Sequence, residues 1–221
     1  MARPSWFLRG YAAFLRSWFR YGKPLASALV NLWRPQEPAN LALPFAFSKI
    51  RALQPQTLAE LADWLAQHTG WTSDPLGGAL DIWPKAGNIE WQLNHKGRFE
   101  DDCDGLAYLT AWAVRPLCDD PNRDYIVTVM YDPRQVALDH WGHVLNLFRH
   151  QGEWRLFSNA ELDPRAWPTP CAALYDNSYY HGYWDSQAQP PRYVYVEVRS
   201  PELTLLAAGL EACSALWGCN L

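Results

Sequence analysis

The stretch GRFEDDCDGLAYLTAWAVR, residues 97–115, sets one cysteine at the beginning of a run of apolar residues with helical spacing. The spacing predicts a buried helix over residues 103–115, which Pro116 ends because proline lacks the N–H that a helix interior needs. Cys103 would be the first residue of this helix. Free N–H groups and partial positive charge at a helix N-terminus stabilise a thiolate, so the position suits a nucleophilic cysteine.

Acidic residues surround this cysteine, namely Glu100, Asp101, Asp102 and Asp104. Unpaired carboxylates a few ångströms away raise the pKa of a thiol, and a bound cation would reverse that effect. Asp and Glu are also common in the first turn of any helix. The acids alone leave two alternatives open, a cation site beside a catalytic thiol or an ordinary acidic helix start.

Strand patterns follow downstream of the cysteine, over residues 124–132, 143–150, 153–159 and 192–198. The Gln-Gly pair between the second and third segments predicts a hairpin. Helices are expected over residues 57–69 and 201–217, and irregular loops over residues 70–100. This order of helices and antiparallel strands predicts an α+β domain.

The chain divides by charge. Residues 1–34 hold six basic residues and no acid, so the rest of this 221-residue chain, whose net charge is −4, carries −10. We expect a basic aromatic arm and a Pro-rich connector over residues 1–45, followed by one domain over residues 46–221. The arm is expected to contact a partner protein or a membrane surface through its rings, Trp6, Phe7, Phe14 and Phe19. A terminal helix packed on its own domain is the alternative, and no nucleic-acid partner is expected for the acidic body.

Five cysteines at irregular spacing give neither a disulfide framework nor a zinc pattern. Cys213 and Cys219 could pair in an exported protein, but a reducing compartment is the simpler expectation. Arginines interrupt every apolar run near the N-terminus, so a signal peptide is not expected. The sequence therefore predicts a soluble, cytoplasmic protein.

A cysteine hydrolase needs an imidazole to share the thiol proton and a third group to orient that imidazole. His143 opens a predicted strand 40 residues after Cys103, and Asn159 closes the partner strand of the hairpin. We expect Asn159 to contact the ring of His143 and keep Ser158 as the alternative, because neighbouring strand positions face opposite sides of a sheet.

The segments DDCDGLA, GHVLNLF and GEWRLFSN resemble, in this order, the signature segments of the transglutaminase-like superfamily. The chain is most similar to the bacterial transglutaminase-like cysteine peptidases, and the Trp-containing lead-in before Cys103 shares in the likeness, which covers about residues 60–160. The resemblance implies a papain-like fold whose nucleophile helix packs on an antiparallel sheet.

By this resemblance Cys103 would be the nucleophile and His143 the general base. Ser158 stands where the family has its aspartate, and Asn159 follows it. Some members of the family bind calcium through the acids on either side of the cysteine, and Asp102 and Asp104 match those positions. The resemblance therefore also implies a possible Ca²⁺ site.

Two functional hypotheses remain. The first is a thiol hydrolase that cleaves peptide or amide bonds of a protein or peptide substrate through an acyl-thioester on Cys103. The second is a non-catalytic structural or adaptor protein of a large assembly, for instance a bacteriophage virion, that keeps the fold. The serine at position 158 and the acidic surroundings of the cysteine support the second.

Overall fold

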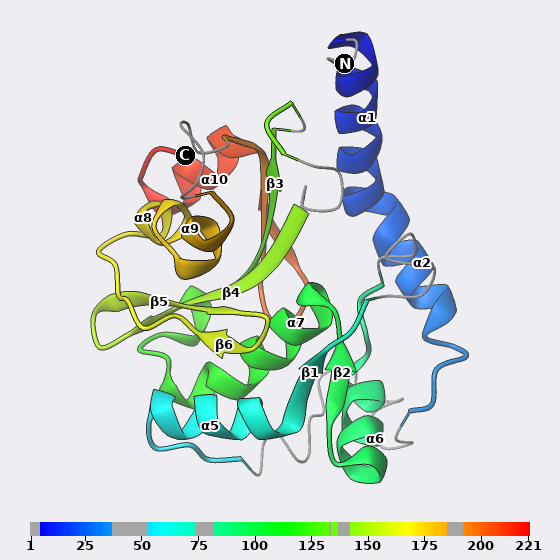
Figure 1. The fold of residues 1–221 in the computed structure, drawn as a ribbon, viewed down its shortest axis with the longest axis vertical. Helices are drawn as coiled ribbons and strands as arrows, with labels where there is room; N and C mark the ends of the chain where they lie inside the picture. Colours follow the sequence, from blue (N-terminus) through cyan, green and yellow to red (C-terminus); the bar gives the residue numbers. More distant parts are fainter. Residues whose placement is uncertain (1–4, 37–52, 74–81, 133, 137–141, 185–191) are drawn as a thin grey trace.

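The computed structural model describes residues 5–36, 53–73, 82–132, 134–136, 142–184 and 192–221 (Figure 1). Its centre is a six-stranded antiparallel sheet with the strand order β6-β5-β4-β3-β7-β8. The strands are β3 (Asp124–Tyr131), β4 (Gly142–His150), β5 (Glu153–Ser158), β6 (Glu161–Leu162), β7 (Tyr193–Arg199) and β8 (Leu205–Ala208). The four predicted strands are all present.

The helices lie on both faces of this sheet, apart from α1, which extends away from it. They are α1 (Ser5–Ser17), α2 (Lys23–Val30), α5 (Leu58–His68), α6 (Ala86–Lys96), α7 (Cys103–Val114), α8 (Pro170–Tyr175), α9 (Ser178–Trp184) and α10 (Leu210–Trp217). A short π-helix, Trp18–Gly22, joins α1 to α2. The predicted fold class, an α+β domain whose cysteine helix packs on an antiparallel sheet, is confirmed.

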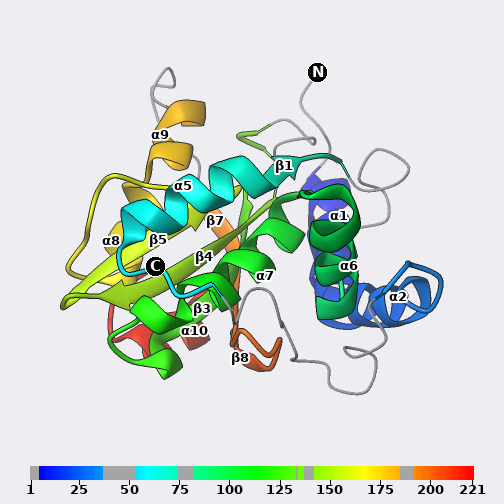
Figure 2. The same ribbon diagram turned by 90° about the horizontal axis from the view of Figure 1, so that it is seen from below.

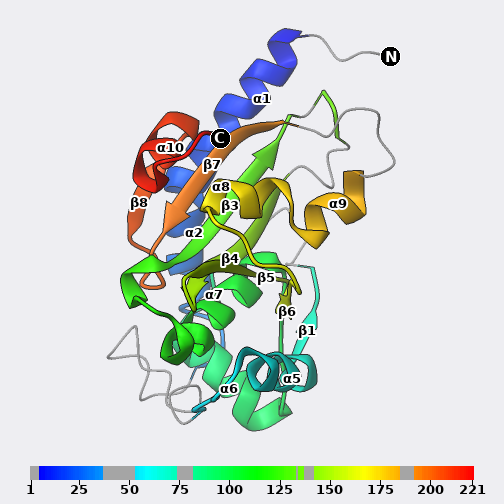
Figure 3. The same ribbon diagram turned by 90° about the vertical axis from the view of Figure 1, so that its left-hand side faces the viewer.

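Strand alternation divides the core into two layers. Val144 and Phe148 of β4 face α7 and share one buried cluster with α5 and α6. Leu145 and Leu147 face the other side and share a cluster with α8, α9 and α10. Figure 3 shows α8 and α9 on the opposite side of β4 and β5 from α5 and α7. A one-residue shift of β4 would exchange the two sets, so burial fixes its register.

Two sequence expectations are corrected by the structure. The expected loops of residues 70–100 contain α6 and two short parallel strands, β1 (Thr69–Trp71) and β2 (Phe99–Asp101). Most of α6 is buried, including polar residues, so it lacks the apolar stripe that reveals a surface helix. The single helix expected over residues 201–217 is instead β8 followed by α10. Gly209, with φ of 94°, connects them.

The predicted arm is only partly separate from the domain. Helix α1 extends away from the sheet (Figure 1), and its Trp6 and Phe14 are 72% and 60% exposed. Phe19, in contrast, packs against the sheet core, and Lys23 at the beginning of α2 is fully buried. The side chain of Phe7 and residues 37–45 lie outside the described residues. A partner for the exposed rings of α1 stays a prediction.

Within the described parts of the chain, every helix is too short or too polar to cross a membrane.

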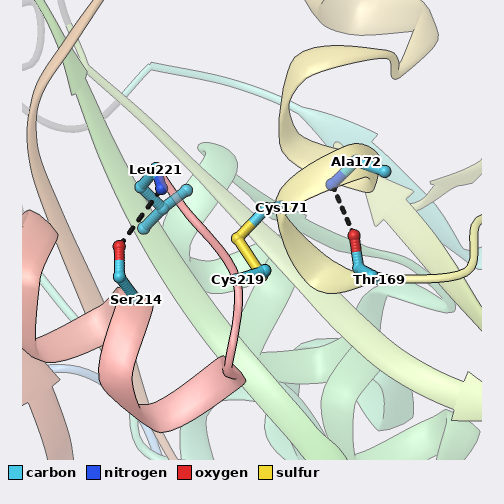
Figure 4. Close-up of a disulfide and its surroundings, with 6 residues drawn as sticks. All are labelled: Thr169, Cys171, Ala172, Ser214, Cys219 and Leu221. Carbon is cyan, nitrogen blue, oxygen red and sulfur yellow. Dashed lines mark hydrogen bonds between the residues drawn. A yellow bond between two sulfur atoms is a disulfide. The ribbon is translucent and has the colours of Figure 1, made fainter.

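The cysteine pairing differs from the sequence expectation. Cys171 of α8 and Cys219 after α10 form a disulfide, across a sequence separation of 48 residues (Figure 4). The sequence had offered Cys213 as the partner of Cys219, but Cys213 is buried inside α10 with a free thiol. Disulfides persist in oxidising compartments. The expectation of no disulfide is therefore wrong, and the cytoplasmic location stays a prediction.

Reduction should destabilise this protein. Closing a loop of 48 residues stabilises a fold by about 2–4 kcal/mol, so dithiothreitol should lower the melting temperature by about 5–15 °C. The double variant Cys171→Ser, Cys219→Ser serves as the control and should melt at the lower temperature with or without reductant. An equal melting temperature for the untreated and reduced wild type would show that the bond is not formed in solution.

Candidate active site

Cys103 is the first residue of α7, as predicted, and its half-buried side chain packs against the core beneath that helix. Asp102 is the N-cap, and its carboxylate accepts a hydrogen bond of 3.1 Å from the backbone N–H of Asp104. The carboxylate of Asp101 accepts from the N–H of Asp102, also at 3.1 Å. These bonds fix the turn that leads into the helix and orient the backbone around the thiol.

His143 is the second residue of β4, and only 3% of it is exposed. Its Nε2 lies 2.8 Å from the hydroxyl oxygen of Ser158. Its ring stacks on Tyr179 of α9, with centroids 3.7 Å apart and planes inclined by 11°. The imidazole is therefore held at one edge by a hydroxyl and on one face by an aromatic ring.

Sheet register explains why Ser158, and not Asn159, reaches this ring. Ser158 pairs with Leu145 across the β4–β5 ladder, so its side chain points to the same face of the sheet as His143 and Leu145. Asn159 lies in the two-residue turn after β5, where its φ of 50° and the φ of 64° at Ala160 reverse the chain. The contact with the ring that was predicted for Asn159 is therefore corrected: the alternative, Ser158, makes it.

Helix α7 and strand β4 run side by side in the same direction (Figures 1 and 2). Their far ends meet, because Nδ1 of His150 donates to the carbonyl of Leu117 at 2.7 Å. From the rise per residue of a helix, Cys103 lies about 21 Å before Leu117. From the rise per residue of a strand, His143 lies about 23 Å before His150. The cysteine and the histidine therefore begin their elements at the same end of the sheet.

Gly142 is the first residue of β4 and precedes His143. His143 faces the side of Leu145, whereas α7 covers the side of Val144, so the imidazole can meet the thiol only around the beginning of the strand. Gly142 shares the α7 side by alternation. A methyl group added there would find one described neighbour within 4 Å, the carbonyl oxygen of Val129 at 3.7 Å. Among the described residues, a side chain at position 142 would therefore meet only this carbonyl oxygen.

Among the three free cysteines, Cys103 alone stands at a helix N-terminus. Burial raises the pKa of the Cys118 thiol well above its usual range and raises the pKa of Cys213 to about 12. Both are therefore thiols at neutral pH, and neither suits a nucleophile.

Comparison with known proteins gives a distant structural likeness. No protein-family model matches the sequence, and no curated protein matches it. Among solved structures, the chain is similar to calcium-bound LapG of Legionella pneumophila, with 12% identity over 72% of each chain and a TM-score of 0.40. A likeness this distant does not extend to substrate or chemistry.

The acids expected to bind calcium do gather in space. Carboxylate oxygens of Asp101, Asp102 and Asp104 all lie within 4.8 Å of one another, and such hard oxygen atoms are the ligands that Ca²⁺ takes. However, Asp104 also forms a buried ion pair with the ammonium group of Lys23 from α2. In this arrangement the cluster already holds the ammonium group of Lys23, so its residues do not fit a divalent ion in addition. Nothing in the sequence pattern indicated Lys23.

Burial dominates the titration of His143. Desolvation lowers the pKa of its imidazole to about 3, because the charged form loses its water. The ring is thus neutral at pH 7 and able to accept a proton. The unfolded chain, with a histidine pKa of about 6.5, binds more protons than the folded chain between these values. Stability must therefore fall as pH drops through this window.

We expect the free energy of unfolding to decrease by up to about 1.4 kcal/mol per pH unit between about pH 6.5 and 4.5. Urea unfolding across this range measures it. His143→Phe keeps an aromatic ring against Tyr179 and should flatten the profile, whereas His95→Gln, at an exposed position, should not. Among the described residues, the carboxyl groups with lowered pKa act at lower pH; they are Asp119, Asp132, Asp163, Asp176 and Glu202. Equal slopes for wild type and His143→Phe would contradict this assignment.

Proposed function

We propose that this protein is a thiol hydrolase that cleaves a peptide or amide bond through an acyl-thioester on Cys103. The observation that carries the proposal is the contact between the buried His143 and the hydroxyl of Ser158, which lies at the same end of the sheet as the beginning of the cysteine helix. A nucleophile at a helix N-terminus, a neutral imidazole and a hydroxyl that orients the imidazole supply the groups that thiol catalysis needs.

In the proposed reaction, the sulfur of Cys103 attacks the carbonyl carbon of the substrate while His143 takes the thiol proton. Backbone N–H groups at the beginning of α7 stabilise the developing oxyanion. The C–N bond then breaks, and His143 returns the proton to the leaving amine. Water attacks the thioester with His143 again as the base, which releases the acid and restores the thiol. An amine in place of water would give acyl transfer by the same steps.

Ser158 is a weaker partner for this histidine than an acid would be. A carboxylate both orients an imidazole and stabilises its protonated form, whereas a hydroxyl only orients it. Desolvation by burial is the reason that the pKa of His143 is low. The chain as it stands therefore supports slow turnover, in which the imidazolium is the costly intermediate.

The assay can use p-nitrophenyl acetate and a mixture of fluorogenic peptides as acyl donors. Cys103→Ala should abolish turnover and the acetyl adduct that intact mass spectrometry detects on the wild type. Cys118→Ala should keep both. His143→Ala should lower the rate by about 10²–10⁴-fold, the usual contribution of a general base. Turnover that survives in Cys103→Ala would refute the proposal.

Ser158→Asp should raise the rate, because a carboxylate at this position would stabilise the imidazolium directly. The matched control is Asn159→Asp, which adds the same charge one residue later, in the turn, and should leave the rate unchanged. A rate for Ser158→Asp below that of wild type, with the variant folded, would contradict the role assigned to Ser158.

A non-catalytic structural protein remains the alternative, favoured by the serine at position 158. Nothing in the comparisons supports the virion setting that the sequence suggested for it. A wild-type chain that forms no adduct at Cys103 with either class of donor would favour this alternative.

A further inference from the structure

The ammonium group of Lys23 is buried against the acidic start of the cysteine helix. Lys23 and Asp104 have side chains 1% and 0% exposed, and they form an ion pair. A lysine is almost never fully buried unless it is paired, because its charge loses its water. Lys23 thus supplies a buried positive charge, from a distant segment of the chain, to Asp104, the residue next to Cys103.

Aromatic rings complete the environment of this ammonium. Nζ of Lys23 lies 4.4 Å from the centroid of the Trp83 ring and 5.4 Å from that of Phe19. Both distances are within the range of cation–π attraction, which strengthens when water is excluded. The surroundings of Lys23 are therefore built to hold one positive charge.

Hydrogen bonds fix α2 and the residues after it in place. Ser27 accepts from the N–H of Trp83 at 2.8 Å, and Asn31 donates to the carbonyl of Trp83 at 2.6 Å. Both polar side chains are buried. Further along, Arg34 lies 3.9 Å from the carboxylate of Asp101. The same segment thus brings two cationic groups to the acidic cluster.

A divalent cation and this ammonium cannot share the cluster at low energy. The three carboxylates lie within 4.8 Å of one another, so an ion bound to them would lie within a few ångströms of Nζ. Like charges at such a distance in a water-poor site repel by several kcal/mol. Occupation by one cation must weaken occupation by the other.

We propose that Lys23 is the resident counter-ion of the acidic cluster and replaces a divalent metal ion there. The chain then needs no calcium to keep the start of α7 in place, and α2 is a positioning part of the site rather than a free arm. A divalent ion can enter the cluster only when the ammonium is removed. This inference does not depend on the hydrolase proposal, since its test measures binding and stability and not turnover.

The test is calorimetric titration and thermal melting with CaCl₂, against KCl at equal ionic strength. Wild type should bind no Ca²⁺ and melt at the same temperature with or without it. Lys23→Met should bind Ca²⁺ and gain a few degrees in melting temperature at saturation. Lys23→Arg keeps the charge and should behave as wild type. Lys85→Met removes a neighbouring ammonium outside the cluster and should also behave as wild type.

The double variant Lys23→Met, Asp104→Asn should lose the Ca²⁺ response, because it removes a ligand as well as the ammonium. If Lys23→Met does not fold without CaCl₂, recovery of folding with CaCl₂ or in the double variant supports the proposal, since either neutralises Asp104. Failure of folding in all these cases overturns it. Calcium binding by wild type with the same affinity as Lys23→Met, or no binding by a folded Lys23→Met, also overturns it.

Discussion

The packing of α7 along β4 is the constraint on which the rest of this structure depends. Because both elements run in the same direction and their far ends are joined at Leu117 and His150, the first residue of the helix and the first residues of the strand reach the same end of the sheet. The burial of Val144 and Phe148 against α7 fixes the register of β4, and pairing with β5 then sets Ser158 beside His143. One packing contact thus determines the position of three side chains.

Ionisable groups gather at this end of the sheet, and their charge is limited in a different way at the histidine and at the cysteine. At the histidine, burial lowers the pKa and keeps the imidazole neutral. At the cysteine, three carboxylates within 4.8 Å would repel one another and any thiolate, and a buried ammonium offsets part of that charge. Two of the basic residues in the segment 1–34 therefore belong to the site, because Lys23 pairs with Asp104 and Arg34 lies close to Asp101.

Much of this could be predicted from local pattern. The helical period after Cys103 predicts the cysteine helix, and the alternation around the Gln151–Gly152 hairpin and before it predicts three strands. These elements place the candidate pair, Cys103 and His143. Local pattern failed where tertiary contacts decide. Helix α6 is buried on most sides and has no amphipathic stripe. The disulfide joins Cys171 and Cys219 because the fold brings α8 and the C-terminus together. Lys23 meets Asp104 across 81 residues of sequence. No spacing rule encodes such contacts.

The choice between Ser158 and Asn159 shows the same limit at the scale of one residue. Alternation alone states that the two side chains face opposite sides, but it does not state which side His143 takes until the partner strand is in register. The structure adds that the backbone at Asn159 has positive φ, a conformation that asparagine tolerates better than most residues. Asn159 therefore has a role in the turn, and this turn ends β5 at Ser158. The residue expected to orient the imidazole thus lies in the turn, and the hydroxyl before it contacts the ring.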